Sequence, residues 1–198
     1  PDKYYFTEHH GGNPENISIL ENNSSLSSGN PTRWNNLLSY IRSNDLSDST
    51  HYSYITSEID LVNFANFLVH QAYAANWDLT QRNVKIMYDD SAQSKIRFLA
   101  FDCDACFYKS DLKFFDYLAG EENPKNILGV LYQKLIENHN FKQLLYRTAL
   151  DVLNEELDPL HVKLQLDSLV QEVKPYILDQ SLRWSNPSDP FIWENKVN

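Results

Sequence analysis

The sequence has few glycines, and their spacing excludes the common nucleotide-binding loops. The five are Gly11, Gly12, Gly29, Gly120 and Gly129. No set of them gives the pattern GxGxxG or GxxxxGK[ST], so this chain contains no glycine-rich phosphate loop. Long apolar runs are missing too. None approaches the roughly 18 residues that a membrane-spanning helix needs, so we expect no membrane span.

Basic residues are scarce relative to acidic ones. Lys and Arg number 17 and Asp and Glu number 27, which gives a formal net charge of −10. A protein that binds DNA or RNA through phosphate contacts normally has the opposite balance, so we expect no nucleic-acid partner. An anionic membrane surface is disfavoured for the same reason.

Cysteine is nearly absent. Cys103 and Cys106 are the only two, and two thiols cannot build a disulfide framework. Their C-x-x-C spacing raises the possibility of zinc, but zinc needs four ligands and the sequence has no second such pair. We therefore predict two partly buried structural cysteines. The cellular compartment stays open.

What the chain does contain is enough apolar material for one domain. Hydrophobic residues make up 42% of its 198 residues, which allows a sizeable core and argues against disorder. The sequence begins with Pro1 and not with Met, so we expect a processed chain or a fragment.

The first third of the sequence alternates between short ordered and polar stretches. Residues 3–8 are aromatic and β-prone, which predicts a strand. Residues 13–32 are rich in Asn, Ser, Gly and Pro, which predicts a surface loop. A helix is expected to open at Thr32, because four apolar residues follow at helical spacing: Trp34, Leu37, Leu38 and Ile41. Residues 43–52 are polar again.

The middle of the sequence predicts a helix followed by a β-hairpin. Asp60 is a good N-cap, and apolar residues at steps of three and four extend the helix to about Ala75. Val84–Tyr88 and Lys95–Phe101 read as two strands joined by a polar turn. Residues 102–110 are irregular.

From Asn126 onward the pattern is helical, and Asp158-Pro159 opens the last long helix as N-cap and first-turn proline. The predicted fold class is therefore α+β and mainly helical, with one β-hairpin between a buried helix and a C-terminal helical bundle.

Acidic residues flank the predicted hairpin. Asp78 and Asn83 precede its first strand, and Asp102 and Asp104 follow its second. A hairpin brings these two positions to the same end, so we expect the four side chains to lie close together. Clustered carboxylates repel each other unless a cation binds, and hard oxygen ligands suit Mg²⁺ or Mn²⁺. Such a metal could hold phosphate without a basic patch.

The order of these residues is that of the catalytic half of a protein kinase. Asp78-x-x-x-x-Asn83 has the offset of the kinase catalytic loop, and Asp102 follows the hairpin in the place of the metal-binding aspartate. The same residues allow two other interpretations. Asp78 could be a plain turn or cap residue. An EF-hand calcium loop fails, because Phe107 and Lys113 stand where Gly and Glu are required, although other calcium geometries stay open.

With these motifs the sequence resembles the CotH kinase family, named after spore coat protein H. The resemblance extends from about residue 5 to residue 184. It is carried by Phe6-Thr-Glu8, Asp60-Leu-Val-Asn-Phe64, Asn76-Trp-Asp78 with Asn83, Phe101-Asp102-Cys-Asp104-Ala-Cys-Phe107, and the C-terminal residues Phe141, Arg147, Leu153, Pro175 and Arg183-Trp184. It implies an atypical kinase fold, secreted or spore-associated, that uses ATP and a divalent metal to phosphorylate Ser or Thr of a protein substrate.

The resemblance also implies roles for individual residues. Asp78 would be the catalytic aspartate, Asn83 and Asp102 metal ligands, and Asp104 a further metal ligand. Residues 1–20 would end a kinase-like N-lobe or hinge, and residues 21–198 would form the C-lobe. Two departures stand out. Trp77 precedes Asp78, where the family has Trp after it, and the family's phosphate-contacting lysine and nucleotide-covering loop are not among these residues. The chain alone is then expected to be inactive.

The sequence is consistent with three functions. The first is the protein kinase-like phosphotransferase just described. The second is a non-catalytic binding protein on the same fold, acting in spore-coat assembly or as an adhesin. The third is a metal-dependent phosphohydrolase that uses the same acids and a water-activating base. The sequence does not give the acceptor protein or the oligomeric state.

Overall fold

The computed structural model describes residues 2–22, 25–80, 83–91, 94–120, 126–189, 191 and 193, with the backbone alone at Thr80. Residue contacts divide the chain into two compact units, 1–149 and 150–198. The first unit holds the sheet and the predicted acidic site. The two units are described separately below.

The sheet of the first unit has four antiparallel strands in the order β2-β1-β3-β4. The strands are β1 (Ile17–Glu21), β2 (Ser25–Ser28), β3 (Val84–Asp89) and β4 (Arg97–Ala100). Ile19 faces Met87 across β1 and β3, and Ile86 faces Phe98 across β3 and β4. The predicted hairpin is thus confirmed as β3–β4. Of its turn, residues 92 and 93 lie outside the described part.

The predicted surface loop over residues 13–32 is wrong. A short 3₁₀ turn, Pro14–Asn16, leads into β1, which is a central strand with Ile17, Ile19 and Leu20 buried. Polar residues on both sides of β1 hid this short apolar run. A strand of this kind is defined by its partners, and the partner strand β3 lies more than sixty residues further along the chain.

The predicted strand over residues 3–8 is also wrong, because this segment forms helix α1 (Lys3–His10). The Asp2 side chain accepts hydrogen bonds from the backbone N–H groups of Tyr4 and Tyr5, and the helix ends at Gly11, whose φ is 78°. Good caps at both ends outweigh the β-propensity of the aromatic residues between them. Phe6 is buried and packs against β1 and β3.

Three helices follow β2 in sequence. They are α2 (Thr32–Ser43), α3 (Ser49–Glu58) and α4 (Leu61–Tyr73). α2 and α4 were predicted, and the Asp60 carboxylate caps α4 by accepting a hydrogen bond from the Asn63 N–H. α3 was missed in a stretch that reads as polar, although Asp48 caps it in the same way through Thr50 and His51.

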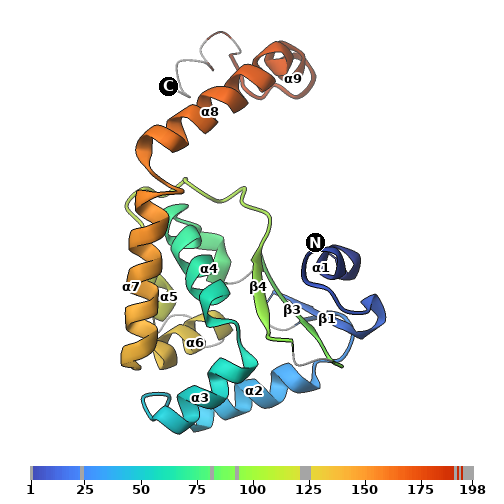
Figure 1. Cartoon of the computed structure of the whole chain (residues 1–198). Helices are drawn as coiled ribbons and strands as arrows, with labels where there is room; N and C mark the ends of the chain where they lie inside the picture. The colour runs from blue at the N-terminus through green and yellow to red at the C-terminus, as the bar shows by residue number, and fades with distance from the viewer. Residues whose placement is uncertain are drawn as a thin grey trace. The chain divides into compact units, whose positions relative to one another are not determined.

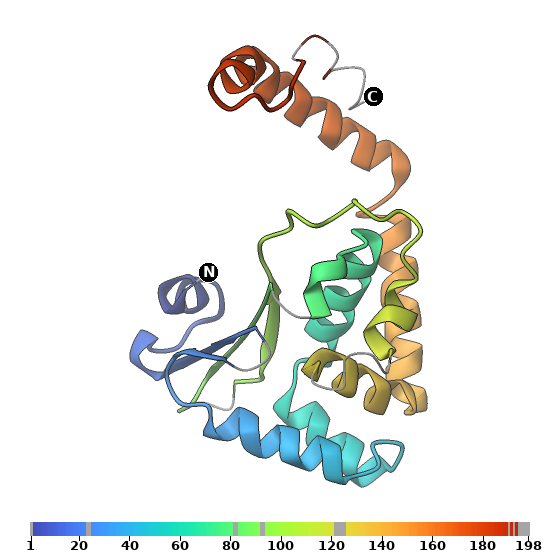
Figure 2. The same cartoon turned by 180° about the vertical axis from the view of Figure 1, so that it is seen from behind.

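The sheet lies between α1 and α4, as Figures 1 and 2 show from opposite sides. Aromatic rings join α4 to the sheet: the Phe98 ring centroid on β4 lies 4.6 Å from that of Phe64 and 6.0 Å from that of Phe67. Each buried aromatic removes a large apolar area from water, so this contact fixes α4 against the hairpin. The end of α4 leads directly into the acidic loop.

The rest of the first unit is helical, as predicted from Asn126 onward, and it also contains one helix, α5 (Phe114–Ala119), that was not predicted. α5 precedes α6 (Ile127–Ile136), and α7 (His139–Asn154) begins in this unit. Phe141 is fully buried, with its ring stacked at 6.0 Å from that of Phe64 on α4.

The second unit contains α8 (Pro159–Val173), a 3₁₀ turn (Lys174–Tyr176) and α9 (Ile177–Trp184). Asp158 caps α8 as expected. The mainly helical α+β class is therefore confirmed. No described helix is both long enough and apolar enough to cross a membrane.

Candidate functional site

The loop between α4 and β3 is built on buried amide side chains. Ala75, at φ 47°, ends the helix. Asn76 then donates a 2.7 Å hydrogen bond to the Gln71 Oε1, and both side chains are buried. The Asn76 Oδ1 accepts a 3.2 Å bond from the Asp78 N–H. The backbone at Asp78, in the 3₁₀ turn Trp77–Thr80, is thereby positioned by α4.

Asn83 joins the two halves of the predicted site. Its Nδ2 donates a 3.0 Å hydrogen bond to the Asp78 Oδ2 and a 3.1 Å bond to the backbone carbonyl of Asp102. Its own N–H donates to the Asn22 Oδ1 at 3.0 Å. The side chain is 7% exposed and the backbone has φ 64°, a conformation that Asn tolerates better than most residues. One carboxamide therefore ties the loop before β3 to the segment after β4.

Asp102 and Asp104 lie on the exposed side of this junction. Asp102 has φ 55°, and both side chains are exposed. In the described part of the chain, neither carboxylate has a hydrogen bond or an ion pair. The structure thus brings Asp78, Asn83 and the backbone of Asp102 together. It does not form the expected cluster of carboxylates, since no three His, Cys, Asp or Glu side chains among the described residues are placed to hold a metal.

The residues present nevertheless fit a magnesium or manganese ion in donor chemistry. Mg²⁺ keeps several waters and commonly takes only one or two protein carboxylates together with substrate phosphates. Asp102 offers an exposed carboxylate with no partner in the described residues, and Asn83, whose Nδ2 is engaged, offers its Oδ1. These two residues would hold the ion, and Asp104 is near in sequence as a further oxygen donor.

Cys103 and Cys106 are structural, as predicted, but they form a disulfide that the sequence did not predict, and only Cys106 is partly buried, since Cys103 is exposed. A turn, closed by a 3.1 Å hydrogen bond from the Cys106 N–H to the Cys103 carbonyl, brings their Cα atoms to 5.1 Å. That separation is within the range of disulfides, roughly 4.4–6.8 Å. The pair encloses Asp104 in a small covalent loop.

Two contacts anchor the same segment to the end of α4. The Phe107 N–H donates a 2.6 Å hydrogen bond to the Ala74 carbonyl, and the Phe107 ring meets that of Tyr73 edge-on at 6.1 Å. The segment after β4 is therefore held to the rest of the unit at Asn83 and at Phe107, and the disulfide closes a turn within the segment. This fixes Asp102 relative to Asp78.

Two residues beside the site, Lys109 and Tyr117, were not predicted, and both contact Trp77. The Lys109 Nζ lies 4.4 Å from the centre of the Trp77 ring, and the Tyr117 hydroxyl donates a 2.8 Å bond to the Trp77 carbonyl. The Trp77 Nε1 is buried and has no partner among the described residues. The adjacency of Trp77 to Asp78 was a usable signal, but the positions of Lys109 and Tyr117 depend on the tertiary structure.

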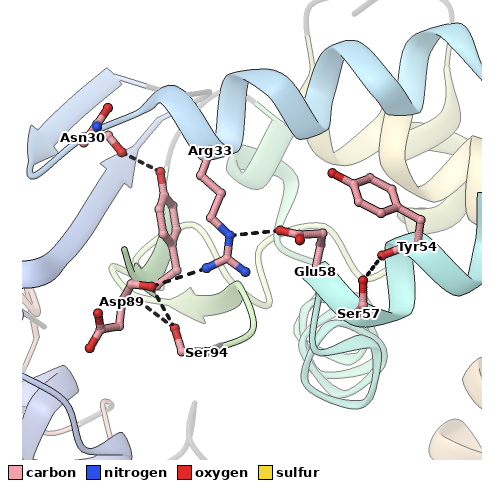
Figure 3. A network of polar contacts seen from close by, with 8 residues as sticks. Asn30, Arg33, Tyr54, Ser57, Glu58, Asp89 and Ser94 are labelled. Carbon is pink, nitrogen blue, oxygen red and sulfur yellow. Dashed lines mark hydrogen bonds and ion pairs between the residues drawn. The ribbon is translucent and has the colours of Figure 1, made fainter. Parts of the chain in front are cut away.

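A second polar network, shown in Figure 3, lies at the other end of β3. The Arg33 Nε is 2.9 Å from the Glu58 Oε2, and its Nη1 donates to the Asp89 carbonyl at 3.3 Å. The Tyr88 hydroxyl donates a 2.8 Å bond to the Asn30 carbonyl, and burial raises the pKa of this phenol. Because its polar groups are paired with one another, this network holds α2, α3 and β3 together. The candidate site is therefore the acidic junction, by which we mean Asp78, Asn83 and Asp102.

Comparison with known proteins gives the family of the chain. No curated protein and no solved structure matches the chain. A family model described as CotH kinase protein matches residues 5–198 and so includes Asp78, Asn83, Asp102 and Asp104. A match over nearly the whole chain establishes membership, and the chain therefore belongs to the CotH kinase protein family.

Proposed function

We propose that this chain carries the catalytic half of a kinase-like phosphotransferase, which moves the γ-phosphate of ATP to a Ser or Thr hydroxyl of a protein. The observation that supports this most directly is the Asn83 side chain, which contacts both Asp78 and the Asp102 backbone. Family membership supports the same reaction class. In this proposal residues 1–20 end an N-lobe or hinge, and residues 21–198 form the C-lobe.

Asp78 would act as the acceptor of the hydroxyl proton. Asn83 engages its Oδ2 at 3.0 Å, which fixes the carboxylate plane and leaves Oδ1 for the substrate hydroxyl. In the transfer, the bond between the γ-phosphorus and the leaving oxygen of ADP breaks and a bond to the substrate oxygen forms. The hydroxyl proton passes to Asp78. Most of the rate gain in such reactions comes from positioning and charge stabilisation.

Asn83 and Asp102 would hold the divalent ion. Bound Mg²⁺ or Mn²⁺ would neutralise the phosphate charge and orient the γ-phosphoryl group. The Asn83 amide and the Phe107 anchor hold the backbone of Asp102 beside Asp78. This rigidity matters because a displacement of about 1 Å at such a site can cost about a hundredfold in rate.

The proposal is tested first by Mn²⁺ binding to this chain. Paramagnetic broadening in ¹⁵N-resolved NMR spectra should affect the Asn83 side-chain amide and the Asp102 backbone before other signals. Asp102→Ala should abolish this selective broadening, and Asp111→Ala, which removes an exposed acid further along the same segment, should preserve it. Broadening that is unchanged in Asp102→Ala would refute the metal assignment.

The second test measures phosphotransfer in the intact protein. Radiolabelled ATP with an acceptor protein should give a labelled Ser or Thr, and Asp78→Asn should lower the rate by about 10²–10⁴-fold, the usual contribution of a general base. Release of inorganic phosphate without any labelled protein would instead indicate a hydrolase. Full transfer activity in Asp78→Asn would contradict the assigned role.

A further inference from the structure

A separate pocket of about 440 Å³ lies at the turn end of the β3–β4 hairpin. Asp78, Asn83 and Asp102 are at the opposite end of the same two strands, so this pocket does not belong to the proposed phosphotransfer site. Its walls come from the end of α1, the start of α4 and the hairpin. Six ionisable residues line it: His9, His10, Asp60, Asp89, Lys95 and Arg97.

The two acids of the pocket are already engaged by the protein. The Asp60 Oδ2 lies 2.9 Å from the Arg97 Nη2. The Asp89 Oδ1 accepts hydrogen bonds from the Ser91 N–H at 2.8 Å and from the Ser91 hydroxyl at 2.7 Å. These contacts reduce the repulsion that either carboxylate would exert on an incoming anion.

Of the two cationic side chains in the pocket, Arg97 pairs with Asp60 and Lys95 does not share that balance. Lys95 is exposed and has no ion pair in the described part of the chain. The His9 Nδ1 donates to the Tyr5 carbonyl at 2.9 Å, which leaves its Nε2 for another partner. Burial lowers the pKa of His10, with further lowering from Arg97 and His9 and an opposing effect from Asp60. Burial is the largest of these effects, and it favours the neutral form of His10.

The shape of the pocket rim depends on two glycines. Gly11 and Gly12 have φ of 78° and 99°, which side chains rarely adopt. A Cβ on Gly12 would lie 2.5 Å from the Asp89 Oδ2, so the Asp89 carboxylate would have to shift if Gly12 carried a side chain. The turn thus closes the end of α1 over the hairpin and brings His10 to the same cavity as Lys95 and Arg97.

We propose that this pocket binds a phosphate group, carried by a phosphomonoester or free in solution, through Lys95, His10 and Arg97. A tetrahedral dianion can accept hydrogen bonds from several directions at once and can use both a point-charge lysine and an arginine fork. A single carboxylate has one charge and fewer oxygens, so it should bind more weakly in the same cavity.

Binding at this pocket is coupled to proton uptake. A bound dianion stabilises the charged form of His10 and raises its pKa, so the affinity must increase as the pH falls towards the ordinary histidine range. Sulfate is the better probe of this coupling, since it keeps its charge at these pH values. The other titratable residues that line the pocket are His9, Asp60, Asp89, Lys95 and Arg97.

The experiment is an NMR titration of the histidine ring protons with sodium sulfate, sodium phosphate and sodium acetate at constant ionic strength, with EDTA present. Excluding divalent ions separates this pocket from the proposed metal site. The signal of His10 is assigned from its absence in His10→Gln. We expect sulfate and phosphate to raise the His10 pKa and to bind more tightly than acetate.

Two variants give the decisive comparison. Lys95→Gln should weaken sulfate binding by about two- to fivefold, as expected for one exposed charge contact, and Lys142→Gln, which removes an exposed charge elsewhere, should leave it unchanged. His10→Gln should reduce the pH dependence of the affinity. An unchanged His10 pKa at saturating sulfate, equal effects of the two lysine variants, or acetate binding as tight as phosphate would each overturn the proposal.

Discussion

Asn83 should be the residue of the acidic junction most sensitive to substitution, because hydrogen bonding and backbone conformation both depend on it. Asn83→Ala removes a 3.0 Å bond to the Asp78 carboxylate and a 3.1 Å bond to the Asp102 carbonyl. A bond to a charged group contributes about 1.5–3 kcal/mol and a neutral one about 0.5–1.5 kcal/mol. Alanine at φ 64° costs about 1 kcal/mol more. Since these contributions overlap, we expect the substitution to lower the free energy of unfolding by about 2–4 kcal/mol.

Urea denaturation followed by tryptophan fluorescence measures this loss, and Asn83→Gly is the matched control. Glycine removes the same two hydrogen bonds but accepts the left-handed backbone, so it should be about 1 kcal/mol more stable than the alanine variant. If the alanine and glycine variants are both within about 0.5 kcal/mol of the wild type, the size of ordinary surface substitutions, Asn83 does not join the two segments and the reasoning is refuted.

Three further predictions concern the framework of the first unit away from the site. Gly29→Ala should lower stability by about 2 kcal/mol or more in thermal denaturation, since Gly29 has φ 81° and a Cβ there would lie 2.6 Å from the Ser18 Cα; wild-type stability would contradict this. Arg33→Met should lower the free energy of unfolding by about 1–3 kcal/mol, a value between those of exposed and buried ion pairs. The reason is that the half-buried Glu58 carboxylate loses its ion pair with Arg33. Backbone hydrogen bonds lower the pKa of Asp48 below its ordinary 3.8. The Asp48 carboxylate therefore contributes fully to stability above pH 3.8, and this contribution is lost as the pH falls through the pKa of the folded state. Asp48→Asn should therefore make the fall in Tm between about pH 5 and pH 2.5 smaller, and an equal fall would contradict the assignment.

The elements that the sequence predicted well are those with local causes. α4 follows from its apolar spacing and from the Asp60 cap, and the β3–β4 hairpin follows from two β-prone runs around a polar turn. The positions of Asp78 and Asn83 before the hairpin, and of Asp102 after it, are likewise fixed by chain order. Their approach at one end of the hairpin follows from the antiparallel pairing.

The elements that the sequence missed depend on distant partners or on competing local effects. β1 is a strand because it pairs with β3, and no local pattern shows that pairing. Residues 3–8 have strand propensity, but Asp2 and Gly11 provide caps and Phe6 finds a core against β1, so the helix is favoured. In both cases the tertiary environment overrides the local preference.

The sequence by itself determined the family, the mainly helical α+β class and the order of the acidic residues along the chain. The tertiary structure decided which atoms meet. It placed the Asn83 amide between Asp78 and Asp102, joined Cys103 to Cys106, and brought α1 and the hairpin turn to a second pocket. The physical reason is that spacing along a chain specifies which side chains can come near one another, whereas hydrogen-bond geometry and burial depend on the backbone conformations that packing selects.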